Sequence, residues 1–184
     1  MKLKLNQKNM LSGLSIALLI FFVQGTLQAR GDYKQFTEKK DKLTYVVDGM
    51  FQISKATDEW DTQDSHQDNS PVKWVLHVSG DNPEVRLRYD FNPKGSDAFK
   101  YGVHVKDMLK SRGINVERVY YRNINGRKAS IIKGIDRDRE KRWLIAVWRN
   151  KSRGFLLECS VEPGKFHKYR EQFNEMINSV HILK

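Results

Sequence analysis

The sequence predicts an α+β domain, in which an antiparallel β-sheet of about six or seven strands is flanked by α-helices. First, short segments alternate apolar and polar residues, as Glu84–Phe91 does, which is typical of half-buried strands. Second, four such segments follow one another between residues 116 and 161 with short connections, which favours a meander of antiparallel neighbours. Third, two segments have a helical period, and the clearer one closes the chain.

Residues 1–29 have the three parts of a secretory signal peptide. They begin with three lysines and no acid, continue with the apolar segment 14–23, and end in small or polar residues. That segment is about half of the ~20 residues that a helix needs to span a bilayer, so cleavage is favoured over an uncleaved anchor, which remains the alternative. We therefore expect a periplasmic or secreted protein, cleaved after Gly25 or Ala29.

The remainder is expected to be a polar lead-in, residues 30–42, followed by a single globular domain, residues 43–184. Removal of residues 1–29 lowers the net charge from +11 to +8, which favours acidic partners. We expect a protein partner first, an acidic polymer or a membrane surface second, and no nucleic acid. The single cysteine permits no internal disulfide.

The first part of the domain is predicted to contain strands and one long loop. The lead-in has few apolar residues and is expected to be loose or a short helix. The segment Leu43–Ser54 is rich in aromatic and β-branched residues around a break at Gly49, which predicts a strand region. The segment Asp58–Ser70 is almost wholly polar and is expected to be a loop.

A hairpin and a helix are expected next. The strands Val72–Ser79 and Glu84–Phe91 are joined by a Gly-Asp-Asn-Pro turn. Ser96 or Asp97 can cap a helix that runs to about Arg112. Its buried face recurs at helical spacing and comprises Ala98, Gly102, Val105 and Leu109.

The meander and a second helix complete the domain. The meander strands are Val116–Arg122, Lys128–Ile135, Arg142–Arg149 and Gly154–Val161. Asn125-Gly126 signals the first hairpin turn, and the segment Trp143–Trp148, apolar on both faces, predicts a central strand. The final helix has one apolar stripe and must lie on the sheet; its stripe is Phe166, Tyr169, Phe173, Met176, Ile177 and Val180.

Cys159 is expected to be a core residue. It keeps phase with Phe155, Leu157 and Val161 on the more apolar face of its strand. A nucleophilic thiol needs a base and an open, electropositive setting. Free cysteine in an apolar segment more often packs as a small hydrophobic side chain.

Two segments of the chain resemble PsbP-like (Mog/PsbP-type) domains: "DGMFQISKATDEW" and "GFLLECSVEPGKFHKYREQFNEMINSV". The resemblance spans Leu43 to Leu183, although Ala56 stands where the family often has proline and the polar loop 58–70 is particular to this chain. It implies an α/β/α sandwich in a non-photosynthetic, exported member. It also implies a non-enzymatic role, since the family includes extrinsic photosystem II subunits and a nuclear-transport factor that binds the GTPase Ran. Fold analogy does not transfer a partner.

The contact surface is predicted at one end of the meander. Successive hairpins turn at opposite ends of a sheet, so the first and third turns share an end. Basic residues in and beside these two turns form the candidate partner-binding site: Arg122, Arg127, Lys128, Arg149, Lys151 and Arg153. Basic turns also serve solubility alone, and that alternative stays open.

No catalytic residue and no cofactor are expected. Asp64, His66 and Asp68 are weak candidates for holding a metal ion, because their loop lacks the glycine and terminal glutamate of an EF-hand. The glycines form no phosphate-binding loop. The sequence therefore favours an exported, non-catalytic binding and assembly module that contacts a protein partner in the cell envelope. The alternatives are an electrostatic binder of acidic envelope polymer or lipid headgroups and, more weakly, a metal-dependent hydrolase.

Cleavage of the signal peptide gives the first prediction. N-terminal sequencing of the exported protein should give a start near residue 26 or 30, because the segment before it has the features that signal peptidase requires. A mature protein that begins at Met1 would instead make residues 1–29 an anchor.

Overall fold

A computed structural model of the chain describes residues 33–35, 44–47, 49–63 and 72–183. The chain divides into two units, Met1–Arg30 and Gly31–Lys184, and every described residue belongs to the second. The predicted signal peptide lies outside the described residues. Among those that are described, no helix is long and apolar enough to cross a membrane.

The described chain contains eleven strands, a short 3₁₀ helix and two α-helices. The strands are β1 (Tyr33–Gln35), β2 (Thr44–Val47), β3 (Phe51–Ser54), β4 (Asp61–Gln63), β5 (Val72–His77), β6 (Glu84–Asp90), β7 (Asn115–Ile124), β8 (Arg127–Asp136), β9 (Lys141–Asn150), β10 (Arg153–Val161) and β11 (His181–Ile182). The helices are α2 (Ala98–Ser111), the short 3₁₀ helix η2 (Pro163–Lys165) and α3 (Phe166–Ser179).

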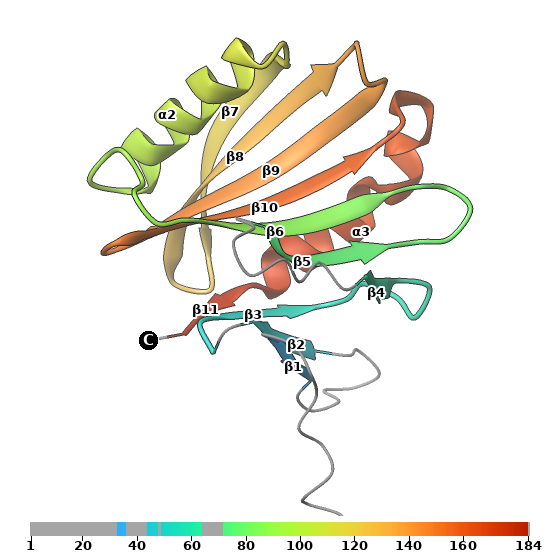
Figure 1. Ribbon diagram of the computed structural model, residues 1–184, viewed down its shortest axis with the longest axis horizontal. Helices are drawn as coiled ribbons and strands as arrows, with labels where there is room; N and C mark the ends of the chain where they lie inside the picture. The colour runs from blue at the N-terminus through green and yellow to red at the C-terminus, as the bar shows by residue number, and fades with distance from the viewer. Residues whose placement is uncertain (1–32, 36–43, 48, 64–71, 184) are drawn as a thin grey trace, which may run out of the picture. The chain divides into compact units, whose positions relative to one another are not determined.

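The strands form two antiparallel sheets (Figure 1). The larger sheet has seven strands in the order β4-β5-β6-β10-β9-β8-β7, and the smaller has four in the order β1-β2-β3-β11. Strands β7 to β10 are the expected meander, and β6 pairs with β10. The α+β class, the number of strands in the main sheet and the meander are therefore confirmed.

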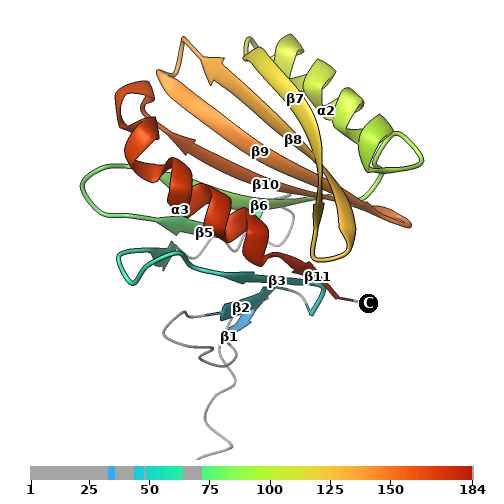
Figure 2. The same cartoon turned by 180° about the vertical axis from the view of Figure 1, so that it is seen from behind.

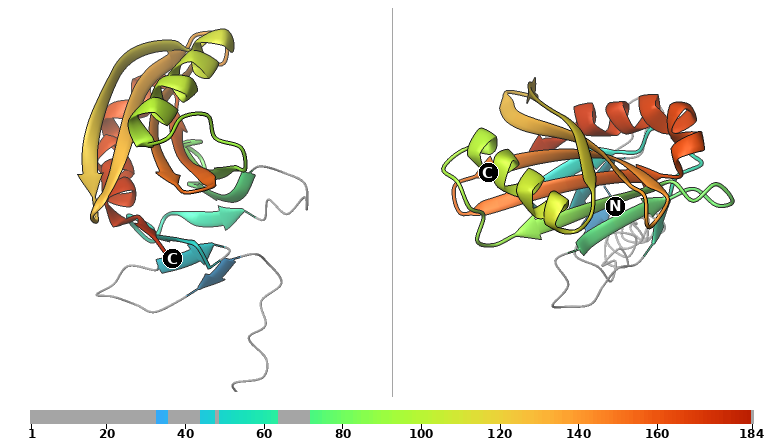
Figure 3. Two further views of the ribbon diagram at one scale, coloured as in Figure 1. Left: turned by 90° about the vertical axis from the view of Figure 1, so that its left-hand side faces the viewer. Right: turned by 90° about the horizontal axis from the view of Figure 1, so that it is seen from above.

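Each face of the larger sheet has its own hydrophobic core. One core includes Leu144, Ala146 and Trp148 of β9 together with residues of α3 and the smaller sheet. The other includes Ile145 and Val147 together with residues of α2. Alternate residues of one strand thus enter different cores, as period-two strand geometry requires. Figures 2 and 3 show α2 and α3 on opposite faces of the sheet.

Three short strands, β1, β4 and β11, were not expected from the sequence. Strand β1 lies in the lead-in that was expected to be loose or helical, and β4 lies in the segment Asp58–Ser70 that was expected to be a loop. Strand β11 was not predicted, and it pairs with β3. Two or three residues are too few to show a period, and the partner strand supplies the pairing that holds them extended.

Cys159 is confirmed as a core residue. Its side chain is fully buried in the core beneath α3, and burial raises the pKa of its thiol far above the ordinary value. The neighbouring Glu158 carboxylate raises it further. A thiol held in this way remains protonated, which is the opposite of what a nucleophile requires.

Helix α2 lies close to β8 because Gly102 has no side chain. The Asp97 carboxylate caps the helix by accepting a hydrogen bond from the Lys100 amide at 2.9 Å, as predicted. The Ser130 hydroxyl of β8 donates to the Ala98 carbonyl at 2.6 Å, where the first turn of α2 meets the sheet. A Cβ atom at position 102 would overlap the Ser130 side chain.

This close approach gives the second prediction. Gly102→Ala should lower the free energy of unfolding by about 1–3 kcal/mol, because the added methyl group forces the helix away from β8. Gly164→Ala is the matched control, since a Cβ atom there would meet no atom within 4 Å. Urea unfolding of both variants measures the effect, and equal stabilities would refute the tight contact.

Candidate partner-binding surface

The structure places all six predicted basic residues at the same end of the larger sheet. Ala129 of β8 lies opposite Trp148 of β9, and Arg149 lies opposite Gly154 of β10. The β7–β8 and β9–β10 turns therefore share an end, which is hereafter called the basic end. It comprises Arg122, Arg127, Lys128, Arg149, Lys151 and Arg153.

Within the basic end, the side chains divide between the two faces of the sheet. On the α3 face, Arg122 Nη2 donates to Asn178 Oδ1 at 2.8 Å. Arg153 lies over the Phe91 ring on this face, with 5.6 Å between its guanidinium carbon and the ring centroid. On the α2 face, Arg149 Nε donates to the Gly95 carbonyl at 3.2 Å, and Lys128 lines a pocket beside the start of α2. The six residues therefore share an end but do not form one patch.

None of the six basic side chains forms an ion pair with a carboxylate of the described residues. Asp90 and Asp97 lie at the same end, but they accept hydrogen bonds from the Tyr101 hydroxyl and the Lys100 amide instead. The six cations outnumber these two carboxylates and form no ion pair with them, so the basic end keeps an excess of positive charge in the part of the chain that the structure describes.

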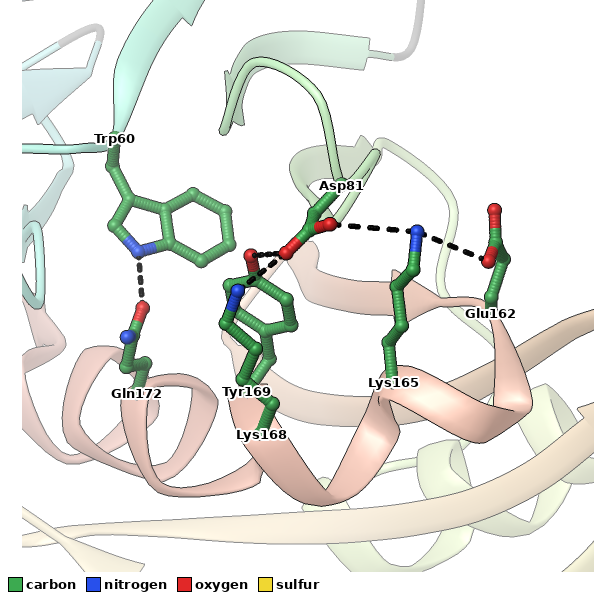
Figure 4. Close-up of polar contacts among 7 residues, drawn as sticks. All are labelled: Trp60, Asp81, Glu162, Lys165, Lys168, Tyr169 and Gln172. Atoms are coloured by element: carbon green, nitrogen blue, oxygen red, sulfur yellow. Dashed lines mark hydrogen bonds and ion pairs between the residues drawn. The ribbon is translucent and has the colours of Figure 1, made fainter.

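At the opposite end of the sheet, two lysines are paired with the carboxylate of Asp81 (Figure 4). Asp81, in the turn between β5 and β6, accepts hydrogen bonds from Lys168 Nζ at 2.5 Å and from the Tyr169 hydroxyl at 2.7 Å. Lys165 Nζ lies 3.5 Å from the other carboxylate oxygen. These donors and charges hold the pKa of Asp81 well below its ordinary value. The network ties the β5–β6 hairpin to α3.

Further ion pairs surround this network. Lys141 Nζ lies 3.5 Å from Glu84, and Arg142 Nη2 lies 2.7 Å from Glu117. The same helix is held from another side by Trp60, whose Nε1 donates to Gln172 Oε1 at 2.6 Å (Figure 4). Near Asp81 the lysines are thus held by a carboxylate, whereas the contacts of Arg122, Arg149 and Arg153 at the basic end are with neutral groups.

Exposed aromatic side chains accompany the basic end. Among the described residues, the exposed large hydrophobic side chains are Phe91, Phe99 and Tyr121, which are 61%, 54% and 47% exposed. The Phe99 and Tyr121 ring centroids are 4.6 Å apart. The two rings line a pocket of about 500 Å³, which Lys128 and Asn123 also line. Apolar area left exposed beside unpaired cations is typical of a protein interface.

The exposed positions of these aromatic residues were not predicted from the sequence. Phe99 follows the buried Ala98 and lies off the apolar stripe of α2, among charged residues, which was the available signal. Tyr121 lies in a strand whose alternation is irregular, so its exposed position depends on the register with β8. Asp64, His66 and Asp68 lie outside the described residues. In the described part, no group of three or more His, Cys, Asp or Glu side chains could hold a metal ion.

No family model matches the chain, and no curated protein matches it. Solved structures do. The cyanobacterial PsbP protein CyanoP from Synechocystis sp. PCC 6803 is 13% identical, with a TM-score of 0.56 over 85% of this chain and 95% of that one. The protein PA94 of Pseudomonas aeruginosa, whose function is unknown, is 9% identical, with a TM-score of 0.51 over 81% of this chain and 96% of that one. The chain therefore has the PsbP-like fold.

The Asp81 network gives the third prediction. Asp81→Asn should lower the free energy of unfolding at neutral pH, because it removes the charge that holds Lys165 and Lys168. The folded pKa of Asp81 lies below the ordinary value of about 3.9, so its contribution is complete above that pH and is lost as the pH falls through the folded pKa.

The difference in denaturant midpoint between parent and Asp81→Asn should therefore shrink from pH 6 to pH 3. Asp138→Asn, which changes an exposed aspartate in the β8–β9 turn, is the control and should show little difference at either pH. A difference for Asp81→Asn that stayed constant over this range would show that the carboxylate charge is not what ties the hairpin to the helix.

Proposed function

We propose that the chain is an exported, non-catalytic binding and assembly module that contacts an acidic protein partner in the cell envelope through the basic end. The observation that carries the proposal is the contrast between the two ends of the sheet. Carboxylates neutralise the cations near Asp81, whereas those of the basic end have no such partner in the described chain. An acidic surface of another molecule would supply the missing charge and would also be attracted from a distance.

The exposed aromatic side chains favour a protein partner over a simple polymer. Interfaces between proteins are enriched in aromatic residues and arginine, which carry much of the binding energy. The pair Phe99–Tyr121 and the stacked pair Phe91–Arg153 provide such anchors on the two faces of the basic end. A polyanion that binds by charge alone would not bury these aromatic rings.

The fold supports the non-catalytic part of the proposal by analogy only. PsbP-like domains, which this chain resembles, act as binding and assembly modules, and the named structural relative is a PsbP protein. The buried Cys159 thiol has no access to a substrate. The signal peptide expected at residues 1–29 would bring the domain to the envelope, where the partner is sought.

The fourth prediction tests the basic end with two variants of equal charge loss. One replaces Arg127, Lys128 and Lys151 with Gln, and leaves in place Arg149 and Arg153, which contact other parts of the fold. The control replaces Lys110, Arg137 and Arg170, which are exposed away from the basic end. Crosslinked capture from native envelope at low ionic strength should fall about tenfold for the first variant, at roughly 0.5 kcal/mol for each lost contact, and much less for the control.

A salt series separates a protein partner from an acidic polymer or lipid. Vesicles with and without phosphatidylglycerol provide the second measurement. Binding to anionic vesicles that matches the envelope binding and vanishes steeply with salt would identify the lipid surface as the partner. Equal loss of envelope binding in both triple variants would show that only net charge matters, and would remove the basic end as the site.

A further inference from the structure

We propose that the partner contributes an extended segment that adds to the outer edge of β7 as a further strand, and that this segment alternates acidic and apolar residues. The inference rests on the proposed function and makes it more specific, because it names the form and the chemistry of the partner at the basic end. Four observations support it in turn: an open edge, the part of the edge that is unprotected, the direction of its backbone groups, and the different chemistry of its two faces.

Strand β7 is a long edge of the larger sheet. In the part of the chain that the structure describes, β7 pairs with β8 alone, and its ten residues contrast with the three of β4 at the other edge. Figure 1 shows β7 at the margin of the sheet, beyond β8. A long edge strand presents a row of backbone donors and acceptors that a partner strand can pair with.

The first half of β7 is protected, whereas the second half is open. The register with β8 shifts between Val116 and Arg118, and such irregularities disfavour further pairing. Glu117 lies in this irregular part and is bound to Arg142. From Arg118 to Ile124 the register is continuous, so this half of the strand can accept a partner.

The β7–β8 turn fixes which backbone groups point outward. Asn125 and Gly126 have φ values of 48° and 78°, as in the two-residue turns of tight hairpins. The residues that flank such a turn, Ile124 and Arg127, exchange hydrogen bonds, and the pattern alternates along the strand. The N–H and C=O groups of Asn123, Tyr121 and Val119 therefore point away from β8, toward the site of an added strand.

The two faces beside this edge differ in chemistry. On the α2 face, Tyr121 and Phe99 line the pocket and would receive apolar side chains of the added strand. On the α3 face lie Arg118 and Arg122, neither of which forms an ion pair with a described carboxylate, and they would receive acidic side chains. Because strand side chains alternate between faces, the matching segment alternates acidic and apolar residues.

The test measures how a fluorescent eight-residue peptide, in which glutamate and valine alternate, binds to the protein. Two variants of the protein, both at Asn123, are compared. Asn123→Ala and Asn123→Pro both remove the amide side chain, but only proline removes the outward N–H. Proline is tolerated at an edge position whose N–H faces solvent. Fluorescence anisotropy at low ionic strength should show that Asn123→Pro binds at least about tenfold more weakly than Asn123→Ala, because the two variants differ in the outward N–H.

Hydrogen exchange of the parent protein provides a readout that does not depend on the variants. The peptide should protect the amides of Val119, Tyr121 and Asn123 more than the alternate amides of β7, which already pair with β8. Circular dichroism tests whether Asn123→Pro is folded. If it is not, the exchange pattern decides the test by itself.

Each other outcome overturns the inference in a distinguishable way. Equal binding by the two variants, or protection elsewhere, excludes strand addition. The basic end then remains the site if its triple variant still binds more weakly than the control, and the proposed function falls as well if it does not. A parent that sediments as a dimer while Asn123→Pro is a monomer would show that β7 pairs with a second copy of the chain and not with a partner segment.

Discussion

The pairing of β6 with β10 is the contact on which the rest of the architecture depends. It joins the β5–β6 hairpin to the meander, and it brings Arg88 to 3.4 Å from Glu158, 70 residues away in sequence. Burial raises the pKa of Glu158, while Arg88 opposes that shift. Glu158 is buried and Arg88 is partly exposed, so the pair adds little net stability. A one-residue slip of β6 would turn Arg88 to the other face of the sheet and leave the buried Glu158 carboxylate without this partner.

The same pairing determines what lies at the basic end. Strand β6 ends opposite Gly154, so the chain that follows it must begin α2 beside the β9–β10 turn. The Tyr101 side chain of α2 packs against Gly154, where a Cβ atom would overlap its ring. Its hydroxyl donates a hydrogen bond to Asp90 at 3.1 Å. Phe91 and Phe99 are thereby placed near turns to which they are not adjacent in sequence. Aromatic residues and cations gather there as a consequence of strand register.

Elements that bury one face could be predicted from the sequence, and elements held only by a neighbour could not. Strand β6 alternates cleanly and α3 has one apolar stripe, so each shows its period in the sequence. Strands β1 and β11 show none, because they exist through pairing with β2 and β3. Similarly, turn order sufficed to place six basic residues at one end, but their division between two faces depends on register, on α2 and on Asn178 of α3.

The charged groups at one end of the sheet stabilise the fold, whereas those at the basic end are available to bind a partner. Asp81 and its lysines hold the β5–β6 hairpin against α3, so charge changes there act on folding. Lys128 and Lys151 are exposed and without carboxylate partners in the described chain, so they can change with little effect on the fold. The outer edge of β7 belongs with the second group, because its outward backbone groups contribute nothing to the ladder with β8. A partner that covers this edge therefore gains hydrogen bonds without breaking any that hold the domain together.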